Sequence, residues 1–468
     1  MEHQETKMDK SLSPIGVWAL AVGCIIGWGA FIMPGDTFLH KAGPLGTALA
    51  MLIASVVMIV ISYNYNYMVN KYPVTGGAFA YTKLSFGENH AFLCSWFLGL
   101  AYLAIVPLNG TALALISRVL LNNAFQVGFH YTVAGYEIYL GEVLLGCAVL
   151  ALFAFLCSRG VQFTGIFQTI LVFSLIIGVL IFIGAALISD KASFANLHPV
   201  FSPEVAPLGG ILSVVAVAPW AFVGYETIPQ AVEEFKFSPK KTHGIMAASI
   251  LIGAAVYVIL NTATAMTLPE QFATWADYIA ALPTLTGLIS LPTFHAADML
   301  LGSAGLIFLG LAVLAAILSS IIGFYMATSR LLYSMSREKV LPGWFGQIHP
   351  RYKTPANAVL FTLAASLVAL PFGRTALEWI VNMSSVGAAI GSCYTCAAAL
   401  KLARSEHKLH MIVMSVLGLM FSGLFLVLLL VPIPGFQCSL NGPAYICLGV
   451  WGVLGAVFYL QSRKKRNQ

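Results

Sequence analysis

Two short stretches of an apolar sequence contain glycine and proline where a membrane helix is expected to continue. The first is GCIIGWGAFIMPG, from Gly23 to Gly35, and the second is AVAPWAFVGYETIPQAVEEF, from Ala216 to Phe235. An interrupted helix frees backbone N–H and C=O groups that lipid cannot satisfy, so an interruption persists only where it faces protein or a watery cavity. A ligand can supply the missing partners there. Both stretches are therefore candidate binding sites for a small molecule.

The first stretch predicts recognition of a carboxylate by the main chain. N–H groups at the start of its second half-helix suit an anionic group, and freed carbonyls suit an ammonium group or a cation. Glycine also lets a small substrate approach the backbone closely. The alternative is close helix packing, because Gly23 and Gly27 form a GxxxG pattern. The substrate-binding candidates here are Ile26, Gly27, Trp28 and Gly29.

The second stretch adds aromatic side chains and one acid. Glu226 is the only acid well inside this span, and intramembrane carboxylates are costly and by default functional. Three roles are open to it: pairing with a substrate amine, carrying a coupling proton, or binding backbone donors freed by the break. Trp220 and Tyr225 are candidate gating residues. The substrate-binding candidates are Trp220, Ala221, Phe222 and Glu226.

The coupling ion and cofactors follow from the remaining polar groups. We expect no cofactor and no bound metal. Ser319 and Ser320 lie in an apolar run, and hydroxyls in membrane helices usually bond their own backbone rather than a metal ion. Sodium is therefore the less expected coupling ion, a coupling proton is possible, and exchange without a coupling ion stays open.

The composition places these stretches in a polytopic helical membrane protein. The chain has 468 residues, of which 59% are hydrophobic and 9% charged, and its mean hydropathy is +0.87. Its apolar runs reach the roughly 20 residues that a membrane helix needs. It lacks HExxH, GxSxG and P-loop motifs, so an enzyme is not expected. The net charge of +6 is attributed to orienting loops rather than to a nucleic-acid partner.

Twelve spans are predicted, with both termini in the cytoplasm. Lys and Arg fall mostly on the inner side of this arrangement, and only Lys41, Arg118, Lys191 and Arg374 fall on the outer side. The predicted localisation is therefore the inner (cytoplasmic) membrane. The spans are 15–39, 45–69, 91–121, 139–157, 163–188, 206–233, 243–267, 298–333, 355–371, 375–402, 409–431 and 442–462.

The two interruptions lie five spans apart and predict an internal repeat. Gly27 and Gly224 are 197 residues apart. An odd number of spans per repeat inverts the second copy, and paired interruptions in inverted halves indicate a transporter's binding site. The predicted organisation is an N-terminal tail at 1–14, a first repeat at 15–188, a second at 206–402, two further helices at 409–462 and a C-terminal tail at 463–468.

Several motifs resemble those of the amino acid–polyamine–organocation (APC) superfamily of permeases. GCIIGWGAF is similar to the first-span GSGIGAGIF of that family, and WAFVGYETIPQAVEEFKFSPKK is similar to its sixth span. SRLLYSMSREKVLPGWF, followed by HPRYKTPANAV, is the most specific match. The resemblance covers nearly the whole chain. It implies the five-plus-five inverted-repeat fold with broken helices 1 and 6, alternating access, and a gating aromatic at Trp220.

The departures from this resemblance bear on the substrate and the coupling. Ile25 replaces a glycine and Trp28 a small residue, which implies a smaller pocket. Gln162 stands where many proton-coupled members have a lysine near the start of span five. Glutamine does not titrate, which argues against a lysine-based proton mechanism. Gln162 and Glu226 are the coupling candidates.

The sequence predicts a secondary transporter of a small amino acid, working as a proton symporter or an exchanger. One alternative is a transporter of a small amine that lacks a carboxylate, such as ethanolamine, a diamine or another monoamine. Another is a ligand sensor that keeps the permease fold without transport. The expected partners are the substrate and the lipid bilayer, with no obligatory protein partner.

Overall fold

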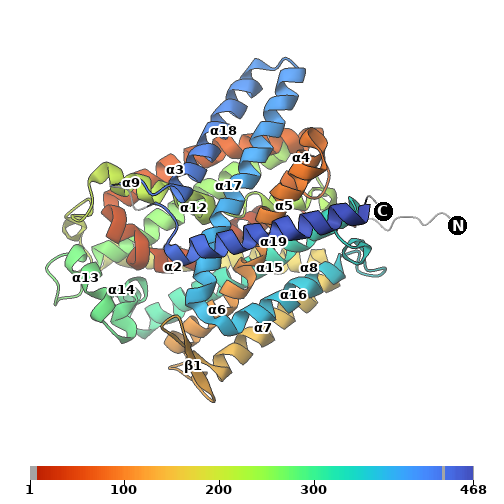
Figure 1. Ribbon diagram of the computed structural model, residues 1–468. Coiled ribbons are helices and arrows are strands. Elements are labelled where there is room, and N and C mark those ends of the chain that lie inside the picture. Colours follow the sequence, from red (N-terminus) through yellow and green to blue (C-terminus); the bar gives the residue numbers. More distant parts are fainter. Residues whose placement is uncertain (1–7, 435–437, 467–468) are drawn as a thin grey trace.

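The computed structural model describes residues 8–434 and 438–466 and is predominantly helical (Figure 1). Nine helical stretches in this part of the chain are long and apolar enough to cross a membrane, which confirms a polytopic helical membrane protein. They are 14–71, 88–120, 140–159, 164–188, 239–266, 303–337, 356–405, 409–430 and 442–461.

The first of these stretches is broken twice. α1 (Pro14–Ile25) begins with Pro14, and the Gly16 N–H donates to the Ser13 hydroxyl, which caps the helix. Residues 26–28 leave the helix. α2 (Gly29–Met33) and a π-helical turn (Pro34–Phe38) follow, and α3 (Leu39–Lys71) then turns a corner at Gly43.

The corner at Gly43 requires glycine. Its φ is +73°, and a Cβ there would lie 2.8 Å from the backbone carbon of Phe201 and the backbone nitrogen of Ser202. The corner separates the end of the first predicted span from the second.

The second interrupted stretch consists of short helical pieces. They are α9 (Pro207–Val215), α10 (Ala218–Ala221), α11 (Thr227–Gln230) and a 3₁₀ turn (Val232–Glu234). Gly224 lies in the gap between α10 and α11 with φ +144°, and a Cβ there would lie 2.6 Å from Cys24 Cβ. The two interruptions therefore pack directly against each other.

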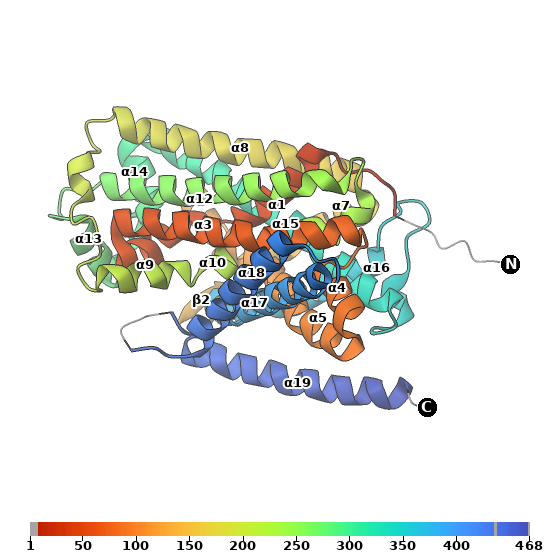
Figure 2. The ribbon, with the colours of Figure 1, turned by 90° about the horizontal axis from the view of Figure 1, so that it is seen from above.

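The remaining helices surround these two stretches (Figures 1 and 2). α1 packs against α8 (Val161–Ile188), α12 (Thr242–Met266) and α15 (Ser303–Arg337). The long ones are α5 (Glu88–Leu103), α6 (Ile105–Leu120), α7 (Leu140–Arg159), α8 (Val161–Ile188), α12 (Thr242–Met266), α15 (Ser303–Arg337), α16 (Ala356–Ala369), α17 (Gly373–Ser405), α18 (Leu409–Leu430) and α19 (Gly442–Arg466). The short ones are α4 (Ala78–Phe86), α13 (Trp275–Ala281) and α14 (Pro292–Leu301).

The outward surface of the bundle carries large apolar side chains. Ile188, Leu409 and Ile446 are 87%, 74% and 70% exposed. A protein surrounded by water rarely exposes so much apolar surface, whereas lipid solvates it without cost. This surface is the one expected to face lipid.

The two ends of the bundle differ. The described part of the chain begins and ends on one side, which we call the terminal side (Figure 2). The opposite side, the hairpin side, carries the antiparallel strands β1 (His130–Val133) and β2 (Tyr136–Tyr139).

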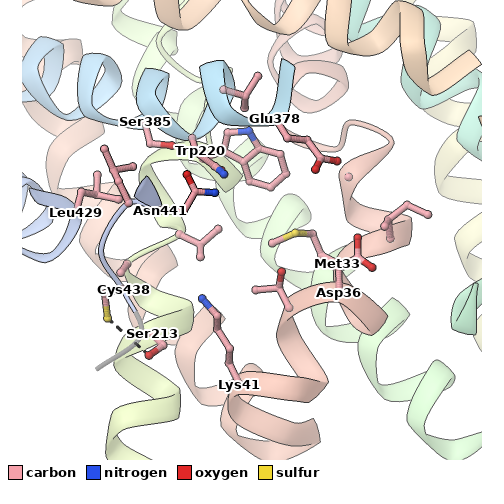
Figure 3. A pocket seen from close by; sticks show the side chains of 18 of the residues that line it. Met33, Asp36, Lys41, Ser213, Trp220, Glu378, Ser385, Leu429, Cys438 and Asn441 are labelled. Carbon is pink, nitrogen blue, oxygen red and sulfur yellow. Dashed lines mark hydrogen bonds between the residues drawn. The ribbon is translucent and has the colours of Figure 1, made fainter. Parts of the chain in front are cut away.

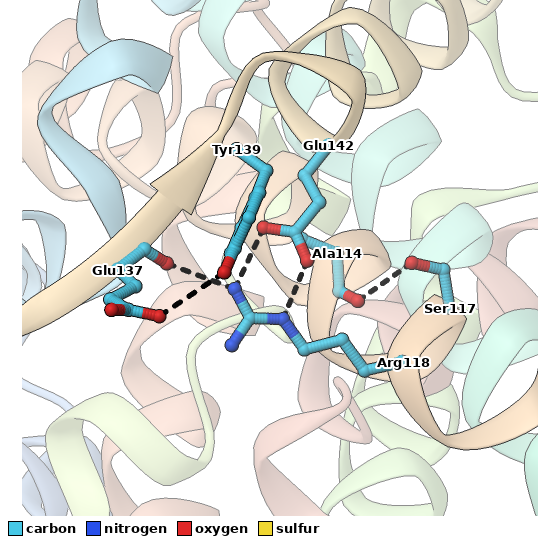
Figure 4. Close-up of polar contacts among 6 residues, drawn as sticks. All are labelled: Ala114, Ser117, Arg118, Glu137, Tyr139 and Glu142. Atoms are coloured by element: carbon cyan, nitrogen blue, oxygen red, sulfur yellow. Dashed lines mark hydrogen bonds and ion pairs between the residues drawn. The ribbon is translucent and has the colours of Figure 1, made fainter. Parts of the chain in front are cut away.

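A partly buried ion pair anchors this hairpin (Figure 4). Arg118 Nε and one terminal nitrogen of its guanidinium donate to the two carboxylate oxygens of Glu142, at 2.5 and 2.7 Å. The guanidinium also donates to the Glu137 carbonyl at 2.9 Å. The Tyr131 hydroxyl donates to the Pro371 carbonyl at 2.6 Å, so the hairpin is tied to the segment preceding α17.

Candidate functional site

A small central cavity lies where the two interruptions meet. Its volume is about 30 Å³. Because one water molecule takes about 30 Å³ of the liquid, the cavity in this conformation admits little more than water. It is lined by Cys24, Ile25, Gly27, Trp28, Gly29, Ile105, Leu108, Asn109, Trp220, Val223, Tyr257, Ser320 and Phe324.

The polar side chains of this cavity are uncharged. The Tyr257 hydroxyl lies 3.1 Å from the carbonyls of both Ile25 and Ala221, one in each interruption. Asn109 Nδ2 donates to Ser320 Oγ at 3.0 Å and to the Ile105 carbonyl. Among the described residues, no Lys, Arg, Asp or Glu lines the central cavity.

Several polar groups at the cavity lack partners in the described part of the chain. Asn109 is buried, yet its Oδ1 accepts no hydrogen bond there. The N–H groups of Gly27 and Trp28 likewise find no acceptor among residues 8–434 and 438–466. Buried polar groups are normally paired, so these groups are available to a ligand. The cavity thus offers both donors and an acceptor.

A larger cavity has a volume of about 390 Å³ (Figure 3). Its lining includes Arg374, and the hairpin residue Ile138 lies against the neighbouring Gly373, so the cavity lies toward the hairpin side. Trp28, Gly29, Leu108 and Trp220 line both cavities, so they form the boundary between them. A Cβ on Gly29 would lie 2.6 Å from Trp220 Cη2. The indole of Trp220 therefore rests on the backbone of the first interruption.

Charged residues surround the larger cavity. The Arg374 guanidinium lies 4.5 Å from the centre of the Trp28 ring. It also donates from Nε to Glu378 at 2.6 Å and lies 3.7 Å from Asp36. Lys41 lines the same cavity. These charged groups lie on the hairpin side of Trp28 and Trp220 and do not line the central cavity.

The structure brings together only some of the residues predicted for the site. Gly27, Trp28, Gly29 and Trp220 line the central cavity, as does Ile25, whose side chain occupies the space beside Gly253. Ile26, Ala221 and Phe222 are buried nearby but do not line it. The Phe222 ring instead packs against Tyr257.

Glu226 and Tyr225 lie on the other face of the second interruption. Glu226 is 4% exposed and accepts a hydrogen bond from the Gly224 N–H at 3.2 Å. Both residues line a cavity of about 10 Å³ against α3, α17 and α18. Tyr225 packs edge-to-face on Tyr65. The acid thus caps its own break, which is one of the three roles that the sequence left open.

Gln162 falls in a stretch at the start of α8 whose side chains lie outside the described residues. The side chain that joins α8 to the first interrupted helix is Gln168. Its Nε2 donates to the carbonyls of Ala19 at 3.3 Å and Ser319 at 3.1 Å. Ser319 Oγ in turn donates to the Gly23 carbonyl.

On the terminal side of the central cavity, a buried ion pair and backbone hydrogen bonds hold the segments together. Arg330 and Glu234 are 1% and 0% exposed at their side chains and form a two-point ion pair of 2.8 and 3.1 Å. The backbone N–H groups of Ser11 and Leu12 both donate to the Glu234 carbonyl at 2.9 Å. The segment before α1 is thereby held to the end of the second interrupted stretch.

A comparison with known families decides the class. The profile of the amino acid permease family matches residues 12–453. The chain belongs to the amino acid permease family. This membership confirms the resemblance to APC permeases and makes the protein a transporter by class rather than an enzyme.

The permease is similar to several curated transporters. It is 26% identical to the methylthioribose transporter of Bacillus subtilis, over 99% of this chain and 95% of that protein. It is 26% identical to the branched-chain amino acid permease BcaP of the same organism, over 82% and 79%. It is 24% identical to the chloroplastic cationic amino acid transporter 7 of Arabidopsis thaliana, over 81% and 63%.

Sequence reasoning missed three polar residues of the permease. Asn109, Tyr257 and Gln168 all lie in predicted spans, as amide or hydroxyl groups in otherwise apolar runs. A single amide in an apolar run could have indicated a site at Asn109 and Gln168, because a buried amide needs hydrogen-bond partners. Tyr257 gives no such signal, since tyrosine is common in apolar helices.

Proposed function

We propose that the permease is a secondary transporter of a small neutral amino acid. The observation that carries this proposal is the uncharged central cavity between two interrupted helices. It offers free backbone N–H groups at Gly27 and Trp28 and a free acceptor at Asn109. A zwitterion carries both groups that such a cavity can bind.

The carboxylate, the ammonium and the side chain of the substrate would each contact a different part of the cavity lining. A carboxylate would accept from the N–H groups of Gly27 and Trp28, and an ammonium would donate to Asn109 Oδ1. Val223, Ile105 and Phe324 form an apolar wall for the substrate's side chain. A charged side chain would be buried there without a partner, at a cost of several kcal/mol (about 3 or more). The cavity therefore favours a small apolar side chain.

The amine alternative depends on Glu226, and its position weakens that alternative. An amine without a carboxylate would leave the N–H groups of Gly27 and Trp28 unpaired, and Glu226 lies on the far face of the break. A neutral sugar is the second candidate, because the cavity is uncharged and a methylthioribose transporter matches 99% of the chain.

We infer a fold of twelve passages that contains two inverted five-helix repeats. Splitting residues 14–71 at Gly43 and 356–405 at Gly373 adds two passages to the nine apolar stretches, and the broken stretch 207–234 adds a third. The interruptions then fall in passages 1 and 6. The excess of Lys and Arg on the terminal side supports a cytoplasmic position for that side and for both termini.

The unequal closure of the two sides supports alternating access as the proposed mechanism. The hairpin side has the 390 Å³ cavity, whereas the buried Glu234–Arg330 pair closes the terminal side. Movement of Trp220 would join the central and larger cavities and admit substrate from outside. Breaking the terminal closure would then release it to the cytoplasm.

For coupling, we propose proton symport or exchange rather than sodium. The carbonyls of Ala19 and Ser319 face one another across α1 and α15, and Gln168 supplies them with an amide N–H. A sodium ion would have to displace this amide. Gln168 itself cannot titrate, so a coupling proton would reside on another group.

Flux into proteoliposomes tests the proposal. The purified permease is reconstituted and uptake of labelled alanine is measured with unlabelled alanine inside, with an inward proton gradient, or with neither. We expect uptake in at least one of the first two conditions, which also separates exchange from symport. Saturable alanine binding without flux in any condition would instead support the sensor alternative.

A further inference from the structure

The terminal side carries a further cavity, in which basic side chains converge from four separate segments. Its volume is about 370 Å³. The segments are residues 9–11, the end of α7, the chain after the second interruption, and the loop between α15 and α16. Asp9 is the acid among its described lining residues, and the basic residues are Lys10, Arg159, Lys236, Arg351 and Lys353.

These five cations differ from several others on the same side. Lys71 and Lys408 pair with Glu406, Lys83 pairs with Glu338, and Arg337 pairs with Glu233. Within residues 8–434 and 438–466, none of the five cavity cations lies in an ion pair with a carboxylate. Like charges gathered around one cavity repel one another, and a bound anion relieves this repulsion.

One wall of this cavity is preorganised by the loop between α15 and α16. The Tyr352 ring lies 5.4 Å from the Arg159 guanidinium and 5.5 Å from that of Arg351, so both arginines are held beside it. The Thr354 hydroxyl donates to the Ser158 carbonyl at 2.6 Å, which ties the loop to α7. Both guanidinium groups are therefore held around the same ring, at the wall of the cavity that this loop forms.

The opposite wall belongs to the segments that flank the two interrupted stretches. The Lys236 N–H donates to the Leu12 carbonyl at 2.9 Å, and the Ser11 N–H donates to the Glu234 carbonyl. Lys10 and Lys236 are thus carried by the paired segments that close the terminal side.

We propose that this cavity binds a phosphate-bearing polyanion, either free in the cytoplasm or as the head group of an anionic lipid. One guanidinium group can donate two parallel hydrogen bonds to two oxygens of a phosphate. Clustered Lys and Arg next to a membrane attract anionic lipids. The assignment of this side to the cytoplasm rests on the proposed topology. The positions of the cavity residues do not depend on that topology.

The bound anion has a conformational consequence. It would bridge Arg159 and Arg351 on one wall to Lys10 and Lys236 on the other. The second wall must move when the terminal side opens, so the anion stabilises the closed terminal side. The site is therefore regulatory and separate from the substrate cavity.

Thermal unfolding of the purified full-length protein tests binding of a free anion. Pyrophosphate is the probe, and sodium chloride of equal ionic strength is the salt control. At saturating pyrophosphate we expect Tm to rise by about 2 °C or more. The double variant R159Q/R351Q should lose most of this rise. The matched control K240Q/K241Q changes the charge equally on the same side, outside the cavity, and should keep it.

Hydrogen exchange in nanodiscs tests the lipid source. We compare phosphatidylcholine alone with phosphatidylcholine plus phosphatidylglycerol, and follow peptides that contain residues 8–13 and 349–354. Slower exchange with phosphatidylglycerol alone assigns a lipid head group, and slower exchange only with pyrophosphate assigns a free anion. Both outcomes support the site, provided that R159Q/R351Q abolishes the effect.

Two results would overturn the site. One is the absence of any response to pyrophosphate or phosphatidylglycerol in the wild type. The other is an equal response in the wild type and R159Q/R351Q, which would assign binding to the surface at large. If R159Q/R351Q has a lower Tm without anion, K10Q/K236Q on the opposite wall provides the same comparison.

Discussion

At the scale of single residues, the contact between Gly29 and Trp220 controls the boundary between the two cavities. A Cβ at Gly29 would lie 2.6 Å from Trp220 Cη2, so Gly29→Ala must displace the indole. Overpacking of this kind costs about 1–3 kcal/mol. We expect initial uptake rates in proteoliposomes to fall about tenfold.

The control for this substitution is Gly184→Ala in α8, where no atom lies within 4 Å of the added Cβ. It should leave uptake unchanged. Trp220→Phe combined with Gly29→Ala should restore part of the rate, because the smaller ring vacates the contested space. Normal uptake by Gly29→Ala alone would show that this contact does not matter.

The second residue-scale prediction concerns Glu226. Its carboxylate accepts from the Gly224 N–H and faces α3, α17 and α18. Glutamine keeps an acceptor oxygen, so Glu226→Gln should keep KM for alanine within about twofold of the wild type. Glu226→Leu would leave the N–H of Gly224 unpaired and should cost about 1–3 kcal/mol of stability, measured by thermal unfolding.

Loss of uptake in the Glu226→Gln variant would indicate a different role for this acid. If Glu226→Gln abolished uptake while Tm was unchanged, the acid would act in coupling or recognition, which are the other roles that its sequence position allows.

At the scale of elements, the buried Glu234–Arg330 pair joins the end of the second interrupted stretch to α15. Removing one member of a buried pair leaves an uncompensated charge, at a cost of about 3–5 kcal/mol. Glu234→Gln should therefore lower Tm strongly and speed hydrogen exchange at residues 8–13, whose N–H groups at Ser11 and Leu12 bond the Glu234 carbonyl.

The neighbouring pair of Glu233 and Arg337 is the matched control. It is longer, at 3.3 Å, and more exposed, with side-chain exposures of 27% and 43%. Exposed pairs contribute about 0–1 kcal/mol, so Glu233→Gln should change Tm little. Equal effects of the two substitutions would show that closure does not depend on the buried pair.

The sequence predicted the elements better than their details. The interruptions expected near Gly27 and Gly224 are present, because glycine and proline within apolar runs act locally on the backbone. The predicted span 355–371 also agrees closely with α16 (Ala356–Ala369). The gap between the first two predicted spans, residues 40–44, contains the corner at Gly43. The hairpin β1–β2 was not predicted, since it depends on a contact with Pro371, which is distant in sequence.

The site was only partly predictable for a related reason. Helical periodicity assigns faces to side chains, but residues 222–226 are not helical, so it could not show that Glu226 and Val223 face opposite ways. Asn109 and Tyr257 reach the cavity by tertiary packing of α6 and α12. The two five-helix repeats and the residue roles stay predictions.

At the scale of the whole molecule, the larger cavity provides a test of orientation. Cys438 lines that cavity and lies 3.6 Å from Ser213 Oγ. A membrane-impermeant methanethiosulfonate should react with it from outside the cell and slow uptake by occupying the cavity. Cys438→Ser should be insensitive. Modification of Cys438 only from the cytoplasmic side would invert the proposed topology.

The central claim is that the permease recognises a zwitterion at the two helix interruptions. The most direct measurement is uptake of labelled alanine and of ethylamine, its decarboxylated counterpart, side by side in the same proteoliposomes. The account predicts saturable alanine uptake and little ethylamine uptake, because only alanine pairs with the N–H groups of Gly27 and Trp28. Preferred uptake of ethylamine would contradict it and return recognition to Glu226.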